Sequence, residues 1–339
     1  MAKKKSSESE YNGILLVDKP AGVTSHDVVD RIRRICKTRR VGHTGTLDPQ
    51  ATGLLVILLG EATRISEYLV GVEKSYEGTV RFGVVSNTYD ADGEIVPGPS
   101  QNLPTSVEQI QAVANALVGT IMQVPPPYSA KKVAGKKLYE YAREGAVPEV
   151  EPREITVKEF EILNLENGQS EFGVDCSSGT YVRSLSHELG QRLGCGGVLV
   201  ELRRTDVGPF QIEDAHTLEA LEELMTSGKF GTAVLPIQRA LPWMPPAWLG
   251  PNAETWIRRG QAIPHNMVTT HDDGRPARGA LVVLCRLSGE AVAIARADVA
   301  PSSPPPRSMV NAVAPWYQPV KIFELSSATK APNEDDSDE

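Results

Sequence analysis

The chain lacks a long apolar run and a recognisable export signal. No uninterrupted apolar stretch in its 339 residues approaches the roughly 18 residues that a membrane-spanning helix requires. The first ten residues contain lysines, but the apolar segment that a secretory signal needs does not follow them. We therefore expect a cytoplasmic protein without a membrane partner.

Cysteine is also scarce. The four cysteines, Cys36, Cys176, Cys195 and Cys285, are scattered and never form a Cys-x-x-Cys pair. This spacing argues against a zinc site and against a disulfide framework. We expect buried or bystander thiols, because free cysteine is commonly a core residue.

Positive charge is in deficit, since 35 lysines and arginines face 43 acids and leave a net charge of −8. Five of the acids lie in the final stretch NEDDSDE, so a large part of the imbalance belongs to this tail. The stretches 31–40, 129–143 and 201–205 are locally basic. Binding depends on such local patches rather than on net charge, so a polyanionic ligand is not excluded.

The spacing of apolar residues predicts both helices and strands in roughly the first 210 residues. Strands are expected over 53–60, 75–85, 153–163, 170–178 and 198–208. Helices are expected over 24–36, 61–70, 105–119 and 179–194, the first with Thr24 or Ser25 as its N-cap.

Beyond about residue 245 the pattern changes to short β-like runs separated by glycine, proline and serine. These runs are 256–264, 280–287, 291–299 and 319–325. They are typical of a small all-β module. The prolines within 242–251 predict a linker before this module.

A glycine-rich stretch, RRVGHTGTLDPQATGLL over residues 39–55, holds a single carboxylate, Asp48. No neighbouring acids or histidines supply a metal site, and the spacing matches neither the P-loop nor the dinucleotide-binding glycine pattern. The residues alone leave open a turn capped by Asp48, a phosphate-cradling loop of another kind, or an aspartate that acts alone as a covalent nucleophile.

Six motifs in a fixed order carry a family resemblance. They are GILLVDKPAGVTSHDVV, GHTGTLDPQATGLL, SYEGTVRFG, NTYDADGE, PPPYSAKKVAGKKLYEYAREG and GTYVRSLSHELG. Together they resemble the bacterial TruB family of tRNA pseudouridine synthases, from about residue 11 to about 210 and more weakly beyond. The resemblance implies an isomerase that flips uridine 55 out of the tRNA T loop and converts it to pseudouridine.

The resemblance also implies the architecture. We expect an α+β pseudouridine-synthase fold, in which a mixed, mainly antiparallel sheet is flanked by helices and the active site lies in a central cleft. The implied division is a disordered lead-in over 1–10, a catalytic domain over 11–244 with an RNA-binding insertion at about 124–145, a PUA-like β-barrel module that binds RNA over 245–326, and a disordered acidic tail over 327–339.

The resemblance assigns three catalytic residues. Asp48 matches the nucleophile, which attacks either the ribose or the uracil ring. Arg183 matches the arginine that pairs with it, and such a neighbour can lower the pKa of a carboxyl and offset the effect of desolvation. Tyr76 matches the tyrosine that stacks on the uracil and assists removal of the C5 proton. Since the isomerisation involves neither redox chemistry nor phosphoryl transfer, we expect no cofactor and no metal.

Five further residues match substrate-binding positions of the family. His43 matches the residue that inserts where the flipped nucleotide had been, and a general-base role for it is a second alternative. Tyr181 and Leu202 match residues that contact the target nucleotide. Lys19 and Pro20 lie in a turn that the family places beneath the active site.

The expected partner is tRNA, through its T stem-loop, with no guide RNA and no obligate protein partner. A second hypothesis is an RNA-binding chaperone of tRNA folding in which modification is secondary. A third is the guide-RNA-dependent relative of the family, which a purified chain acting on a bare transcript would exclude.

Overall fold

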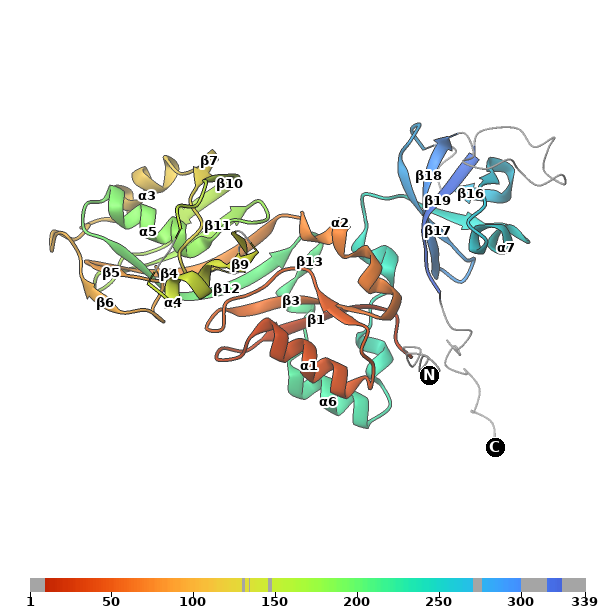
Figure 1. Cartoon of the computed structure of the whole chain (residues 1–339), viewed down its shortest axis with the longest axis horizontal. Helices are drawn as coiled ribbons and strands as arrows, with labels where there is room; N and C mark the ends of the chain where they lie inside the picture. Colours follow the sequence, from red (N-terminus) through yellow and green to blue (C-terminus); the bar gives the residue numbers. More distant parts are fainter. Residues whose placement is uncertain are drawn as a thin grey trace.

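The computed structural model describes residues 10–129, 132–133, 135–145, 148–270, 276–299 and 316–324. They form a large sheet in the first part of the chain and a smaller sheet at its C-terminal end (Figure 1). Most of the predicted lead-in and the whole predicted acidic tail lie outside the described residues.

The large sheet has nine strands within the described residues, in the order β1-β3-β12-β4-β11-β10-β7, with β2 beside β3 and β13 beside β12. The strands are β1 Gly13–Lys19, β2 Val41–His43, β3 Thr52–Leu59, β4 Lys74–Phe82, β7 Gly119–Gln123, β10 Arg153–Ile162, β11 Gln169–Cys176, β12 Gly197–Val207 and β13 Phe210–Gln211. Only the pairing of β3 with β12 is parallel among these strands. The expected mixed, mainly antiparallel sheet is confirmed.

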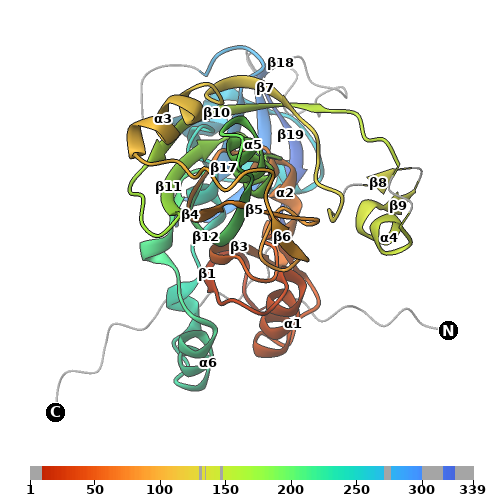
Figure 2. The ribbon, with the colours of Figure 1, turned by 90° about the vertical axis from the view of Figure 1, so that its left-hand side faces the viewer.

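Helices flank both halves of this sheet. They are α1 Ser25–Ile35, α2 Ser66–Val70, α3 Val107–Asn115, α5 Val182–Arg192 and α6 Leu218–Thr226, and the 3-10 helix η1 Gly60–Ile65 precedes α2. Apolar residues of α1 and α6 pack with those of β1 and β3, whereas α3 and α5 pack on β4, β10 and β11. In Figure 2 α1 and α6 lie together at the bottom of the molecule, while α3 lies at the top. Each half of the sheet therefore has its own core.

Helix α1 forms where the sequence predicts it. Thr24 and Asp27 make a capping box, in which each side chain accepts a hydrogen bond from the other residue's backbone N–H. Val28, Val29 and Ile32 lie on the buried face. The capping box sets where the helix starts, and the apolar residues set which face is buried. Both the start and the orientation of the helix therefore follow from local sequence.

Strand β12 joins the two halves of the sheet. It pairs with β4 along most of its length but with β3 only at Arg203 and Arg204, within the described residues. Gly53 of β3 has φ +96, and a Cβ there would lie 2.3 Å from the carbonyl oxygen of Arg204, so the close approach requires glycine. Beyond this contact the halves separate, and a cleft of about 700 Å³ opens beside β12.

The C-terminal sheet has six strands among the described residues, in the order β15-β19-β18-β17-β14-β16. They are β14 Pro246–Leu249, β15 Ile263–Pro264, β16 Val268–Thr270, β17 Leu281–Cys285, β18 Ala291–Val299 and β19 Trp316–Ile322. The expected small, barrel-like β-module is confirmed in its fold (Figure 1). Its role in RNA binding stays a prediction.

Two expectations for this region are wrong. The predicted linker 242–251 contains β14, which pairs with both β16 and β17. Within the predicted β-like run 256–264, the residues up to Arg258 belong to helix α7, Ala253–Arg258. Ala253 and Ile257 are buried one turn apart on α7, and Glu254 pairs with Arg258 across the same spacing. The prolines around β14 and the short length of α7 made these two elements difficult to predict from the sequence.

The C-terminal module packs on the part of the chain that forms the large sheet. One core cluster contains Ile14 and Leu16 of β1 together with Val283, Ile294 and Phe323. All four cysteines are buried and free, as expected. Within the described residues, no helix is both long and apolar enough to cross a membrane.

The predicted insertion at 124–145 lies only partly within the described residues. It contains the short strands β8 Lys132–Val133 and β9 Lys136–Lys137, which pair, and helix α4 Leu138–Arg143. These elements extend away from the large sheet in Figure 2. Their contact with RNA stays a prediction.

Much of the charge in two predicted basic stretches is engaged within the protein. Arg31 forms ion pairs with Glu219 and Glu222 of α6 at 3.0 and 2.8 Å. Arg203 pairs with Asp18 at 2.8 Å. These ion pairs connect α1 with α6 and β12 with β1, so the number of basic residues in a stretch overstates the charge available to a ligand.

Candidate active site

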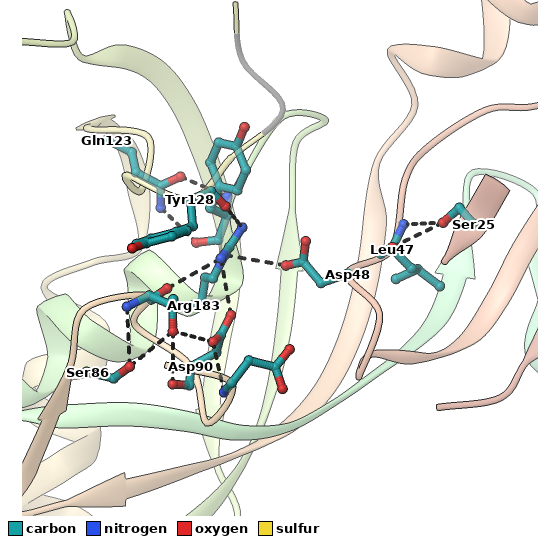
Figure 3. Close-up of polar contacts among 11 residues, drawn as sticks. Ser25, Leu47, Asp48, Ser86, Asp90, Gln123, Tyr128 and Arg183 are labelled. Carbon is teal, nitrogen blue, oxygen red and sulfur yellow. Dashed lines mark hydrogen bonds and ion pairs between the residues drawn. The ribbon is translucent and has the colours of Figure 1, made fainter. Parts of the chain in front are cut away.

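The loop between β2 and β3 places Asp48 at the cleft, and the residue before Asp48 anchors this loop. Leu47 is buried, its backbone N–H donates to Ser25 Oγ at 2.8 Å, and the Ser25 hydroxyl donates to the Leu47 carbonyl at 3.1 Å (Figure 3). Because Ser25 is the first residue of α1, the start of that helix fixes the position of the loop.

Arg183 meets Asp48 from the opposite half of the sheet. It lies in the first turn of α5, and its Nε is 3.4 Å from Oδ2 of Asp48 (Figure 3). The arginine side chain is only 6% exposed, whereas that of Asp48 is 45% exposed. The expected pair is therefore present, with its carboxylate open to the cleft and its guanidinium enclosed.

The other nitrogens of Arg183 are also engaged. Nη1 lies 3.1 Å from Oδ2 of Asp90 and donates to the Thr88 carbonyl at 3.4 Å. Nη2 donates to the Tyr128 carbonyl at 2.8 Å. The guanidinium is thus held from three sides, which fixes the orientation of the nitrogen that faces Asp48.

Tyr76 and Leu202 lie on adjacent strands near Asp48. Leu202 lines the cleft together with Asp48. Tyr76 is 8% exposed, and Arg204 faces it across the pairing of β12 with β4. Arg204 is 1% exposed and donates to the carbonyls of Leu54 and Gly45 at 2.7 and 3.1 Å. A buried guanidinium therefore connects Tyr76 with the loop that carries Asp48.

Tyr181 stands directly before α5. Its backbone N–H donates to Gln123 Oε1 at 2.8 Å, and its carbonyl accepts from Gln123 Nε2 at 3.1 Å. The guanidinium of Arg153 lies 4.6 Å from the centre of the Tyr181 ring, a cation–π contact. This residue is firmly held beside the arginine that pairs with Asp48.

His43 ends β2, half-buried, a few residues before Asp48. Burial lowers the pKa of its imidazole, and the charge of Arg204 lowers it further. A neutral ring suits stacking in place of a nucleotide better than binding of phosphate.

Lys19 is completely buried beneath the loop, while Pro20 is exposed. The ammonium of Lys19 donates to the carbonyls of Pro20, Val23 and Pro49 at 2.9, 2.8 and 3.0 Å. Burial lowers the pKa of Lys19 to about 8, against the opposing charge of Asp48. These contacts make Lys19 a support of the turn and the loop, out of reach of a substrate in this structure.

Residues 33–182 match the family model of the TruB family pseudouridylate synthase N-terminal domain. Residues 183–241 match that of the tRNA pseudouridylate synthase B C-terminal domain. This chain belongs to the TruB family. Among its relatives, the tRNA pseudouridine synthase B of Solibacter usitatus is 42% identical over 75% of this chain and 86% of its own length. The tRNA pseudouridine synthase B of Opitutus terrae is 47% identical over 69% of this chain and 96% of its own length.

Solved structures extend the similarity over most of the chain. An H/ACA RNP bound to a substrate RNA containing 2′-deoxyuridine includes a chain 27% identical to this one, with a TM-score of 0.66 over 92% of this chain and 85% of that one. A chain in a Cbf5-Nop10-Gar1 complex is 28% identical to this one, with a TM-score of 0.65 over 96% of this chain and 91% of that one. Coverage this wide includes the C-terminal sheet.

In this TruB-family chain the pKa of the Asp48 carboxyl is raised overall, whereas pairing with an arginine alone would lower it. The surrounding walls of the cleft desolvate the carboxyl, and this effect is the largest and raises its pKa even though 45% of the side chain is exposed. The charge of Arg183 lowers the pKa, and the negative charge of Asp90 raises it again. Arg183 therefore opposes desolvation without cancelling it. The ionised carboxylate is less stable here than in water, which makes it more reactive towards an electrophilic carbon.

Two residues of the site were missed in the sequence. Asp90 lies in NTYDADGE, which has the composition of a turn, and Arg204 lies within a strand pattern. Asp90 pairs with Arg183 and also lines the cleft. The sequence neighbours of Arg204 are Arg203 and Thr205, so the strand pattern did not indicate that this arginine is buried.

Replacing Asp90 by asparagine tests its hold on Arg183. Loss of this charged partner leaves the guanidinium less well fixed, and we expect the single-turnover rate to fall by about 10- to 100-fold. Because the charge of Asp90 raises the pKa of Asp48, the acid limb of the pH–rate profile should move to lower pH. A slower rate with an unmoved acid limb would contradict the charge coupling between Asp90 and Asp48.

Proposed function

We propose that this protein is a tRNA pseudouridine synthase that isomerises uridine 55 of the T loop. The observation that carries the proposal is the Asp48–Arg183 pair at the cleft, 3.4 Å apart, in a chain that belongs to the TruB family. A single carboxylate is sufficient for this chemistry, since the reaction exchanges one bond of the uracil for another and is redox-neutral.

The chemistry follows from the position of Asp48. The uridine leaves the stack and enters the cleft, at a cost of a few kcal/mol. The ionised carboxylate attacks the ribose or the uracil ring, and the bond between C1′ and N1 breaks. After the base turns, C5 bonds to C1′ and loses its proton, N1 gains one, and the carboxylate is released. Arg183 holds Asp48 in place throughout.

The surrounding residues support this sequence of steps. Leu202 shares the cleft with Asp48 and provides an apolar surface for the detached base. Burial raises the pKa of the Tyr76 phenol, against the opposing charge of Arg204, and the phenol therefore stays protonated at neutral pH. Tyr76 accordingly acts as a neutral ring against the uracil, and because a protonated phenol does not take up a further proton, the C5 proton passes to another acceptor.

The deciding experiment is to treat transcribed, unmodified tRNA with the purified chain and to map pseudouridine at single-nucleotide resolution. We expect modification at position 55 without a guide RNA. Modification at another position would contradict the substrate assignment. Binding without modification would favour the RNA-chaperone alternative, and activity only with a guide RNA would favour the guide-dependent one.

The pH dependence of the rate should reveal Asp48. The ionised form attacks, and burial raises the pKa of this carboxyl, so activity should decline on acidification at a pH above the ordinary aspartate value of about 3.9. Single-turnover rates at saturating protein measure this limb, and fluorescence at each pH checks that the protein stays folded. A rate that stays constant down to about pH 4 would contradict the raised pKa.

A further inference from the structure

The turn that holds Arg183 is itself in an unfavourable conformation. Thr88 supplies a carbonyl and Asp90 a carboxylate to the guanidinium, and Tyr89 lies between them. Tyr89 has φ +68, in the left-handed region that bulky residues seldom adopt. Such a conformation persists only where the surroundings impose it. Some neighbouring group must therefore keep Tyr89 in place.

His187 of α5 provides that contact. Its ring stacks on the ring of Tyr89, with centroids 3.9 Å apart and planes inclined by 13°. His187 follows Arg183 by one helical turn, so both side chains leave the same face of α5. Arg183 thus contacts Thr88 and Asp90, and His187 contacts the residue between them. Two side chains of one helix therefore hold three consecutive residues of the turn.

The backbone of the turn is fixed on its other side. The Tyr89 carbonyl accepts a hydrogen bond from the Leu199 N–H of β12 at 3.1 Å, and Asp90 forms an isolated parallel bridge with Leu199. The Thr88 hydroxyl donates to Oδ1 of Asp90 at 2.5 Å. These bonds fix the backbone of the turn. The ring of Tyr89 is the part of the turn that α5 contacts through aromatic packing.

The contact between His187 and Tyr89 is made by ring faces. Nδ1 of His187 is buried and makes no hydrogen bond with the described residues. Burial lowers the pKa of this imidazole, which is therefore neutral at neutral pH. A flat neutral ring can be replaced by another aromatic ring, and this makes the contact open to a conservative test.

We propose that Tyr89 and His187 are positioning residues for pseudouridine formation, and that their stack holds the turn in the conformation in which Thr88 and Asp90 fix Arg183 against Asp48. The inference rests on the proposed function. Neither aromatic residue is among those that line the cleft, and both act through the turn.

The first test compares His187→Ala with His187→Phe in single-turnover assays on transcribed tRNA. Loss of an aromatic stack should slow the alanine variant by about 3- to 10-fold with unchanged tRNA affinity, whereas phenylalanine should restore the rate. Glu188→Ala alters the neighbouring surface residue of α5, which pairs with Arg192, and should leave the rate unchanged. Melting curves identify any variant that has lost its fold.

The second test asks whether His187 acts through Asp90. In an Asp90→Ala background, His187→Ala should cause a smaller loss than in the wild type, because the Asp90 carboxylate is gone and only the Thr88 carbonyl is left for the stack to position. Tyr89→Gly relieves the backbone strain but removes the ring, and it should be as slow as His187→Ala. Its melting curve separates this effect from a change in stability.

Three results would overturn the inference. They are an unaffected His187→Ala rate, a phenylalanine variant as slow as the alanine variant, and an equal loss with and without Asp90. An inactive wild-type chain would overturn the proposed function together with the inference. An active wild type with an unaffected His187→Ala would overturn the inference alone.

Discussion

Replacing Asp48 by asparagine should abolish pseudouridine formation, with a loss of at least about 10⁴-fold in the single-turnover rate. Asparagine keeps the shape of the side chain but cannot form the covalent bond to the substrate. Affinity for tRNA should stay unchanged, since the carboxylate supplies reactivity rather than attraction for a polyanion. Filter binding and nucleotide-resolution mapping on the same transcript measure both quantities.

The melting temperature of this variant provides an internal control, because the direction of its change can be predicted. A carboxyl whose pKa is higher in the folded than in the unfolded state lowers stability when it is ionised, and this cost disappears as the pH falls. Asparagine removes the cost at neutral pH, so Asp48→Asn should melt no lower than the wild type. Modification at the wild-type rate would contradict the role assigned to Asp48, and a clearly lower melting temperature would contradict its raised pKa.

Substitution of Arg183 should have the second largest effect. Arg183→Met removes the cation and leaves two nearby carboxylates, Asp48 and Asp90, without their shared partner. Loss of a fixed charged group from an active site costs about 10²- to 10³-fold in rate. The pKa of Asp48 should rise further, because the charge of Arg183 is what lowers it, and the acid limb should move to higher pH.

Arg183→Lys separates charge from geometry. Lysine keeps a positive charge but cannot reach Asp48, Asp90 and the Tyr128 carbonyl together, as the planar guanidinium does. We expect a lower rate than in the wild type, with an acid limb closer to that of the wild type than to that of Arg183→Met. Identical profiles for the two variants would show that the positive charge has no influence on Asp48.

Local sequence predicted the elements that depend on local rules. The capping box and apolar face of α1 placed that helix, and alternating residues placed β4, β10 and β11. The six motifs led to the family before any coordinates. Where a local rule was ambiguous the prediction was wrong, as for β14, which lies among prolines, and for α7, which has fewer than two helical turns.

The order of residues along the chain was enough to identify the family, the lone aspartate, and the arginine that pairs with it. Only the tertiary structure showed that Asp90 shares Arg183, that Arg204 joins Tyr76 to the loop, and that Arg31 and Arg203 are engaged in ion pairs. These contacts form where β12 brings the two halves of the sheet together. Apolar periodicity reports which face of an element is buried, but it does not say which distant polar groups will meet there.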